Sequence, residues 1–254
     1  MTRNLYAEWT KLRTLPGTGR LLLALVMLTV AVSVAAAAVV SCTSSGCGYD
    51  PAKIILFGVQ AGQAVVATLA VLTISGEFST GMIRTTLAAM PGRVSVLATK
   101  AVILTGLTLA AGSVAVLASA PAGRWILLGN GFPPESLALT GGPMLRAASG
   151  SVLYLALIAL FSLGIATAVR DSATAIGVVL GLLYLFPAVI LMVPDADVAK
   201  ILWQISPMNA GLAVQATTHL AGLPLSPWAG LGVLAAWATA ALLGGGLLLR
   251  ARDA

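Results

Sequence analysis

Few side chains in this sequence are suited to acid–base, nucleophilic or metal chemistry. Of its 254 residues only 9% are charged, and the chain has two cysteines and one histidine. Asp195 and Asp197 follow Pro194 after an apolar run, where they could bind a cation but more simply face solvent. A solvated side chain is also the simpler interpretation of His219, so no metal site is predicted.

The phosphate-binding chemistry of an ATPase is missing as well. The sequence has no G-x-x-x-x-G-K-[ST] loop, whose backbone N–H groups would hold the phosphates of ATP. The chain is therefore not expected to be an enzyme or to hold a cofactor. If the protein uses ATP, the ATP, its magnesium and the catalytic residues must belong to a partner subunit.

The two cysteines, Cys42 and Cys47, stand in one short stretch between apolar runs. On an oxidising side of a membrane they could form a disulfide that closes a small loop. Sequence alone does not determine whether the two sulfur atoms can meet, so free thiols remain the alternative.

Six apolar runs dominate the sequence, of which 59% is hydrophobic. Each has about the 20 residues that a helix needs to cross about 30 Å of hydrocarbon. Every charged residue except Lys100 falls outside these runs, and Lys100 is near enough to the end of its run to snorkel to the interface. The runs predict an all-α membrane protein of one domain. They cover residues 21–40, 54–74, 94–117, 147–169, 173–193 and 228–249.

The basic residues predict the orientation of the spans. An even number of spans puts both termini on one side of the membrane. That side receives all 14 Lys and Arg residues except Lys53, Arg124, Arg146 and Lys200. Because cytoplasmic loops are rich in Lys and Arg, both termini are expected in the cytoplasm. The net charge of +6 is explained in the same way, without a nucleic-acid partner.

Polar side chains inside the runs have two interpretations. Gln60 and Gln63 share one face of the second predicted span, and Tyr184 stands in the fifth. Such side chains form hydrogen bonds between helices, or they line a path for cargo. A largely apolar path would suit hydrophobic or amphipathic cargo and reject small ions.

Four segments between or before the spans have patterns of their own. Residues 1–20 predict a cytoplasmic amphipathic helix that Pro16 and Gly17 end, and residues 119–146 an irregular outer loop. Residues 75–93 predict an amphipathic helix from Glu77 to Met90 between the second and third spans. Within the outer connection, residues 194–227, the segment 198–218 is too short to span the membrane. It either re-enters the bilayer or lies on its surface.

Two motifs resemble those of ABC type-2 export permeases. The first is Glu77-Phe78 followed by Gly81-Met82-Ile83-Arg84-Thr85-Thr86-Leu87 and Pro91-Gly92-Arg93, which is similar to a cytoplasmic loop of that family. The second is Glu8-Trp9-Thr10-Lys11-Leu12-Arg13-Thr14, which resembles the start of its drug-efflux and antibiotic-resistance members. The six predicted spans agree with the layout of the family.

The resemblance implies a membrane subunit that pairs with a second permease copy, identical or not, and recruits two ABC ATPase subunits for export. In such a permease the 75–93 loop is a coupling loop that docks on the ATPase. The residues assigned to docking are Glu77, Phe78, Gly81, Met82, Arg84 and Leu87. The resemblance also places Gln60, Gln63 and Tyr184 along a path at the dimer axis, and makes 198–218 re-entrant.

A non-transporting membrane protein, such as an immunity factor or a sensor scaffold, is the alternative. A neighbouring reading frame that encodes an ATPase would favour the exporter, and its absence would favour this alternative.

Overall fold

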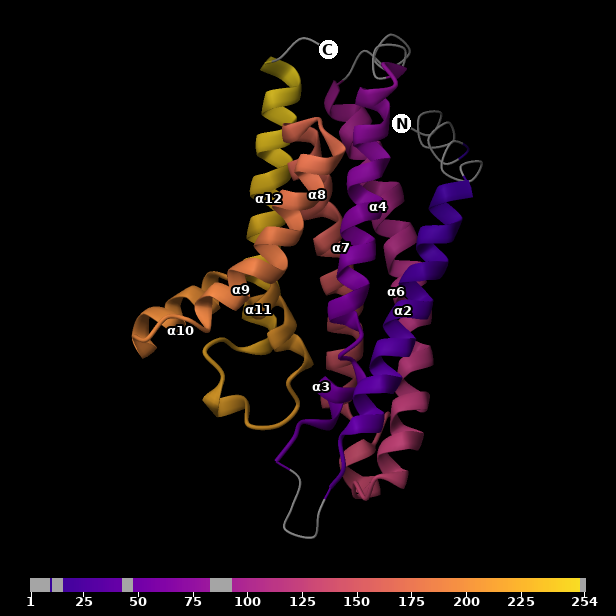
Figure 1. Cartoon of the computed structure of the whole chain (residues 1–254), viewed down its shortest axis with the longest axis vertical. Helices are drawn as coiled ribbons and strands as arrows, with labels where there is room; N and C mark the ends of the chain where they lie inside the picture. Colours follow the sequence, from indigo (N-terminus) through magenta and orange to yellow (C-terminus); the bar gives the residue numbers. More distant parts are fainter. Residues whose placement is uncertain (1–9, 11–15, 43–47, 83–92, 252–254) are drawn as a thin grey trace.

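The protein is an elongated bundle of helices. The computed structural model describes residues 10, 16–42, 48–82 and 93–251, and these residues contain helices and no strand. Figure 1 shows that α2 (Pro16–Val39) begins, and α12 (Pro227–Ala251) ends, at the same end of the bundle. We call this the terminal end. The opposite end contains the short helix α3 (Pro51–Ile55).

Among the described residues, six helical segments are long and apolar enough to cross a membrane, which confirms an all-α, multi-pass membrane protein. The first, second and sixth are α2, α4 (Val59–Ser79) and α12. The third is α6 (Arg93–Gly129), and the fourth joins the short 3-10 turn η1 (Pro134–Leu137) to α7 (Gly142–Val169). The fifth consists of α8 (Ser172–Leu180), the π-helical turn η2 (Gly181–Leu185) and α9 (Phe186–Ile190).

Helix α7 lies at the centre of the bundle. It packs against α4, α6, α8 and α12, and its span is more buried than any of the other five. The crossing of α7 and α12 is very close, because a Cβ atom on Gly164 would lie 2.4 Å from the backbone carbon of Ala241. Small residues let the backbones of membrane helices approach in this way.

The second span begins later than its apolar run predicts. Residues 51–55 form α3, the chain turns, and α4 starts at Val59 rather than at Ile54. The turn is held against α2, since a Cβ atom on Gly58 would lie 1.8 Å from the carbonyl oxygen of Thr29. Helix α4 also ends later than predicted, at Ser79, and so includes Glu77, which lies beyond the predicted run 54–74.

Two further boundaries differ from the predictions. Helix α2 begins at Pro16, before the apolar run predicted from Leu21, and the first residue of a helix is the position where proline loses no helical hydrogen bond. Helix α6 continues through Pro121 to Gly129, so most of the outer loop predicted from Ser119 is absent. Membrane helices tolerate such a proline more readily than a run of polar residues. The predicted helix over residues 1–20 lies outside the described residues up to position 15, except for Thr10.

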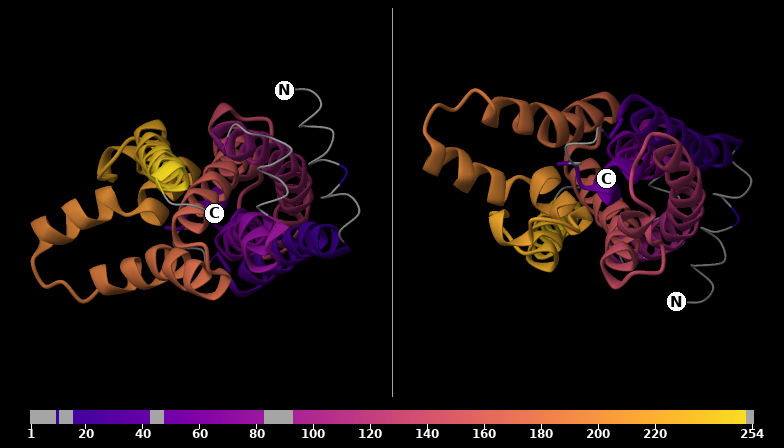
Figure 2. Two further views of the ribbon diagram at one scale, coloured as in Figure 1. Left: turned by 90° about the horizontal axis from the view of Figure 1, so that it is seen from above. Right: turned by 90° about the horizontal axis from the view of Figure 1, so that it is seen from below.

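The end of the fifth span and the helix that follows it form a hairpin that projects from the bundle, with α9 in one arm and α10 (Ala196–Ile205) in the other (Figure 2). Helix α10 has no buried residue. Helix α11 (Pro207–Leu212) follows α10, is largely buried and packs on α12. Two 3-10 turns, η3 (Ala213–Gln215) and η4 (Leu220–Gly222), complete the connection.

Candidate functional site

The predicted docking segment does not form one helix. Helix α4 ends at Ser79, Thr80 caps it, and Gly81 has a φ of +69°. Glycine adopts this left-handed conformation without steric cost and ends helices for that reason. The predicted helix from Glu77 to Met90 is therefore wrong at Gly81, although Met82 is again helical. Arg84 and Leu87 lie outside the described residues.

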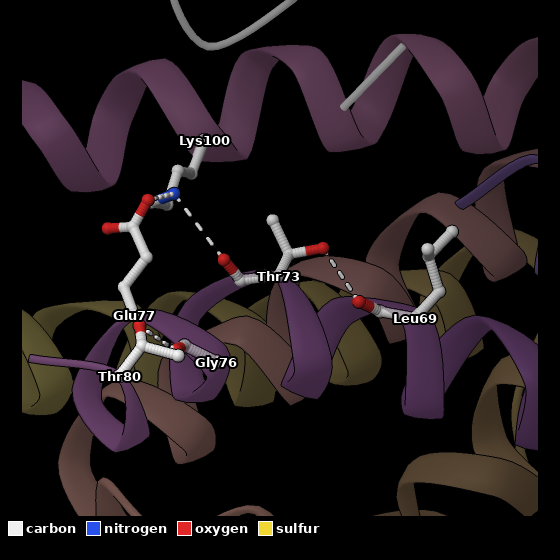
Figure 3. Close-up of polar contacts among 6 residues, drawn as sticks. All are labelled: Leu69, Thr73, Gly76, Glu77, Thr80 and Lys100. Carbon is white, nitrogen blue, oxygen red and sulfur yellow. Dashed lines mark hydrogen bonds and ion pairs between the residues drawn. The ribbon is translucent and has the colours of Figure 1, made fainter. Parts of the chain in front are cut away.

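Glu77 is buried against the next span instead of facing outward (Figure 3). Its Oε1 lies 2.8 Å from Nζ of Lys100 on α6, and the two side chains are 7% and 1% exposed. Nζ of Lys100 also donates to the carbonyl oxygen of Thr73 at 3.4 Å. Lys100 therefore points to α4 and does not snorkel to the interface, because an ion pair inside the bundle satisfies its charge.

Phe78 connects the end of α4 to the turn between α7 and α8. The guanidinium carbon of Arg170 lies 5.2 Å from the centre of the Phe78 ring, a cation–π contact. One turn away, Ser172 Oγ donates to Ser75 Oγ at 2.8 Å. The last turn of α4 thus contacts α6 through Glu77 and the α7–α8 turn through Phe78 and Ser75. A force applied to the end of α4 would act on all of these helices.

Asp171 caps the N-terminus of α8 in the same turn. Its Oδ1 accepts a hydrogen bond from the backbone N–H of Thr174 at 2.8 Å. The hydrogen bonds of the Thr174 side chain and backbone lower the pKa of the Asp171 carboxyl below its ordinary value. The carboxylate is therefore ionised at neutral pH and stabilises the start of the fifth span.

The structure separates the residues predicted to line a path. Gln63 is fully buried, accepts a hydrogen bond from the Tyr154 hydroxyl on α7, and donates to Met208 Sδ on α11 at 3.3 Å. It holds three helices together, which is the simpler of the two interpretations considered. The side chain of Gln60 instead lines a cavity, and the Tyr184 hydroxyl donates to the carbonyl oxygen of Gln60.

A second polar cluster near the opposite end was not predicted. Asp50 caps α3 through the N–H of Ala52 and also accepts hydrogen bonds from Thr217 and Thr218, far along the chain. Gln215 donates to Ser151 Oγ at 3.0 Å. The pair Asp50-Pro51 is a sequence signal for the cap, but no sequence pattern indicates the long-range partners.

Cys42 is disulfide-bonded, and Cys47 lies outside the described residues. The backbone N–H of Cys42 donates to the carbonyl oxygen of Asn130 at 2.9 Å, which attaches the end of α2 to the end of α6. Among the described residues no group of three or more His, Cys, Asp or Glu side chains could hold a metal ion.

Comparison of the chain with models of known protein families finds no match, and neither does comparison with curated proteins.

Proposed function

We propose that this chain is the membrane-spanning permease subunit of an ATP-driven ABC exporter. Its cargo would be a hydrophobic or amphipathic compound such as a drug, an antibiotic or a lipid-like molecule. The observation that carries the proposal is the Glu77-Phe78 and Gly81–Leu87 motif. The helices that it joins, α4 and α6, end and begin at the terminal end of the bundle, which supports a docking role for this loop (Figure 1).

The proposed location is the plasma membrane, with both termini in the cytoplasm. Arg20, Arg93, Arg170 and Arg250 belong to helix ends or turns at the terminal end. An excess of basic residues on one side of a bilayer is typical of the cytoplasmic side. The proposed docking loop would then face the compartment in which ATP is available.

In the proposed mechanism the chain contributes a gate and its partners contribute the energy. ATP binding would close two ABC ATPase subunits against each other and move the loops docked on them. Phe78, Gly81 and Met82, together with Arg84 and Leu87, would form the docking surface. The carboxylate of Glu77 is not part of this surface, because it is engaged with Lys100. The movement of α4 would shift a two-permease assembly between inward-open and outward-open states.

Co-purification with an ABC ATPase subunit from the same cells tests the proposal. Arg84→Glu should abolish ATP-dependent export and weaken the complex. The substitution replaces a cation of the loop with an anion, which would repel the acidic groups of the ATPase that Arg84 is proposed to meet. Arg20→Glu is the matched control. It makes the same change in charge, and Arg20 is exposed on α2 near the same end of the bundle.

A chain that never associates with an ATPase would contradict the exporter. ATP-dependent export that persists unchanged in Arg84→Glu would contradict the docking role of the 75–93 loop. A chain that protects cells without any ATPase would instead support the immunity or scaffold alternative.

A further inference from the structure

A cavity of about 650 Å³ opens near the end of the bundle opposite the termini. It lies between the last turn of α2, α3, the first turn of α4 and the helices α10 and α11. Much of its wall is apolar and includes Val40, Ile54, Phe57 and Leu212. Sites for small molecules commonly have about 300–1,000 Å³ and a mostly apolar wall with a few polar groups.

The polar side chains of this wall include several uncommitted donors. Lys53, Gln60, Asn209 and Trp203 line the cavity. Within the described part of the chain, none of these side chains has a hydrogen-bond or ion-pair partner, although their donors are an ammonium group, two amides and an indole N–H. They come from α3, α4, α11 and α10, so the tertiary structure brings them together.

Asp50, the one acidic side chain among the described residues of the wall, is already engaged. Asp50 Oδ1 accepts from Thr217 Oγ1 at 2.6 Å and from the Ala52 N–H at 3.1 Å, and Oδ2 accepts from the Thr218 N–H at 3.0 Å. Gln215 is engaged too, because its amide donates to Ser151. The cavity therefore presents one uncommitted cation and several neutral donors beside an apolar wall.

We propose that this cavity binds an amphipathic anion. Its carboxylate or phosphate group would pair with Lys53 and accept hydrogen bonds from Asn209 or Trp203, while its apolar part would lie along Phe57 and Leu212. Charge-assisted hydrogen bonds are the stronger ones, and they give such a site preference for an ionised head group. As a cargo site the cavity rests on the proposed exporter function, but as a binding site it does not. The occupant is either a free amphiphile or an anionic lipid of the bilayer.

Binding to the purified full-length chain, without any ATPase, tests the site. The chain is placed in phosphatidylcholine nanodiscs and titrated with dansyl-undecanoic acid and with its uncharged methyl ester. Energy transfer from tryptophan to the dansyl group measures binding. The ester should bind about tenfold more weakly or worse, because it loses a hydrogen bond to a charged group.

Lys53→Gln should reduce binding of the acid to the level of the ester, and Lys53→Arg should restore most of it. Lys200→Gln is the matched control, since Lys200 is an exposed lysine on α10 that does not line the cavity. Asn209→Leu should weaken binding of the acid without changing binding of the ester. Circular dichroism of each variant verifies that it is folded.

Two outcomes would overturn the site: equal binding of acid and ester to the wild-type chain, or full binding of the acid by folded Lys53→Gln. Nanodiscs that contain phosphatidylglycerol separate the two sources of the anion. Displacement of the probe identifies a lipid as the occupant, and retention identifies a free amphiphile; both uphold the site. The binding assay contains no ATPase, so it is independent of export. Failure of the export assay would not affect the binding site, and failure of the binding assay would not affect the exporter proposal.

Discussion

Two lysines at opposite ends of the bundle have very different surroundings. Lys100 is 1% exposed and forms an ion pair with Glu77 across two helices at the terminal end. Lys53 stands three residues after Asp50, yet Asp50 is engaged elsewhere and Lys53 is exposed beside a cavity. The charge of Lys100 therefore stabilises the contact between two helices, whereas the charge of Lys53 is available to a ligand.

The difference extends to the packing of the helices at each end of the bundle. In the terminal half, α7 and α12 approach so closely that Gly164 and Gly245 leave no room for a side chain. At the opposite end the helices α10 and α11 leave the 650 Å³ cavity open. Substitutions at the terminal end are therefore expected to change stability, and substitutions around the cavity are expected to change binding.

The largest effect is expected from Lys100→Met. This variant leaves the Glu77 carboxylate buried without its ion-pair partner, which should cost about 3–5 kcal/mol of unfolding free energy. The double variant Glu77→Gln/Lys100→Met should recover much of that loss. Unfolding in detergent micelles, followed by tryptophan fluorescence, measures both.

Lys53→Met is the matched control at the opposite end, where an exposed side chain should change the unfolding free energy by no more than about 0.5 kcal/mol. Equal losses for the two lysine variants would show that the two ends do not differ in the way described.

Gly164→Ala should have the next largest effect. The added Cβ would lie 2.4 Å from the backbone of α12, and a helix backbone cannot move aside without disturbing its own packing. A loss of about 2–3 kcal/mol of unfolding free energy is expected. At Gly177 on α8 a Cβ would meet nothing within 4 Å, so Gly177→Ala should be neutral or slightly stabilising.

The two glutamines of α4 sharpen the comparison within a single helix. Gln63→Leu leaves the buried Tyr154 hydroxyl without its acceptor and should cost about 1–2 kcal/mol in the same unfolding assay. Gln60→Leu should leave stability nearly unchanged, because its side chain lines the cavity and has no hydrogen bond within the described residues. If Gln60→Leu proved as destabilising as Gln63→Leu, its assignment to the cavity would be wrong.

The smallest effect concerns acid pH and Asp171. Its pKa is lower in the folded protein, so its contribution to stability is fully present above the unfolded value of about 3.9. That contribution is lost as the pH falls through the folded pKa. Asp171→Asn keeps a capping oxygen but does not titrate, so its melting temperature should fall less between pH 5 and pH 3 than that of the wild-type chain. If the melting temperatures of the two proteins fell in parallel with pH, the assignment of Asp171 as an ionised cap of α8 would be wrong.

Some features of the candidate site could be predicted from local patterns. The Glu-Phe pair does lie in the last turn of the second span, and the Gly81 that follows marks the end of that helix. The prediction that one helix continues past Gly81 was wrong. A single residue in the left-handed conformation ends a helix, but the apolar residues on either side of it can keep helical spacing, so the pattern does not show the break. The boundaries of α4 shifted by about one turn because packing of Gly58 on α2, and not hydropathy, sets where the helix begins.

By itself the amino-acid sequence determined the six spans. Placing a charge or an unpaired backbone polar group in hydrocarbon costs free energy, and this cost depends on local sequence, so the length and polarity of each run are enough to predict it. Only the tertiary structure decided which polar groups meet. The pairing of Lys100 with Glu77, the burial of Gln63 and the gathering of Lys53, Asn209 and Trp203 around one cavity depend on how each helix is rotated and where it crosses its neighbours. Those positions arise from contacts among residues far apart in the chain, which the periodicity of one helix does not contain.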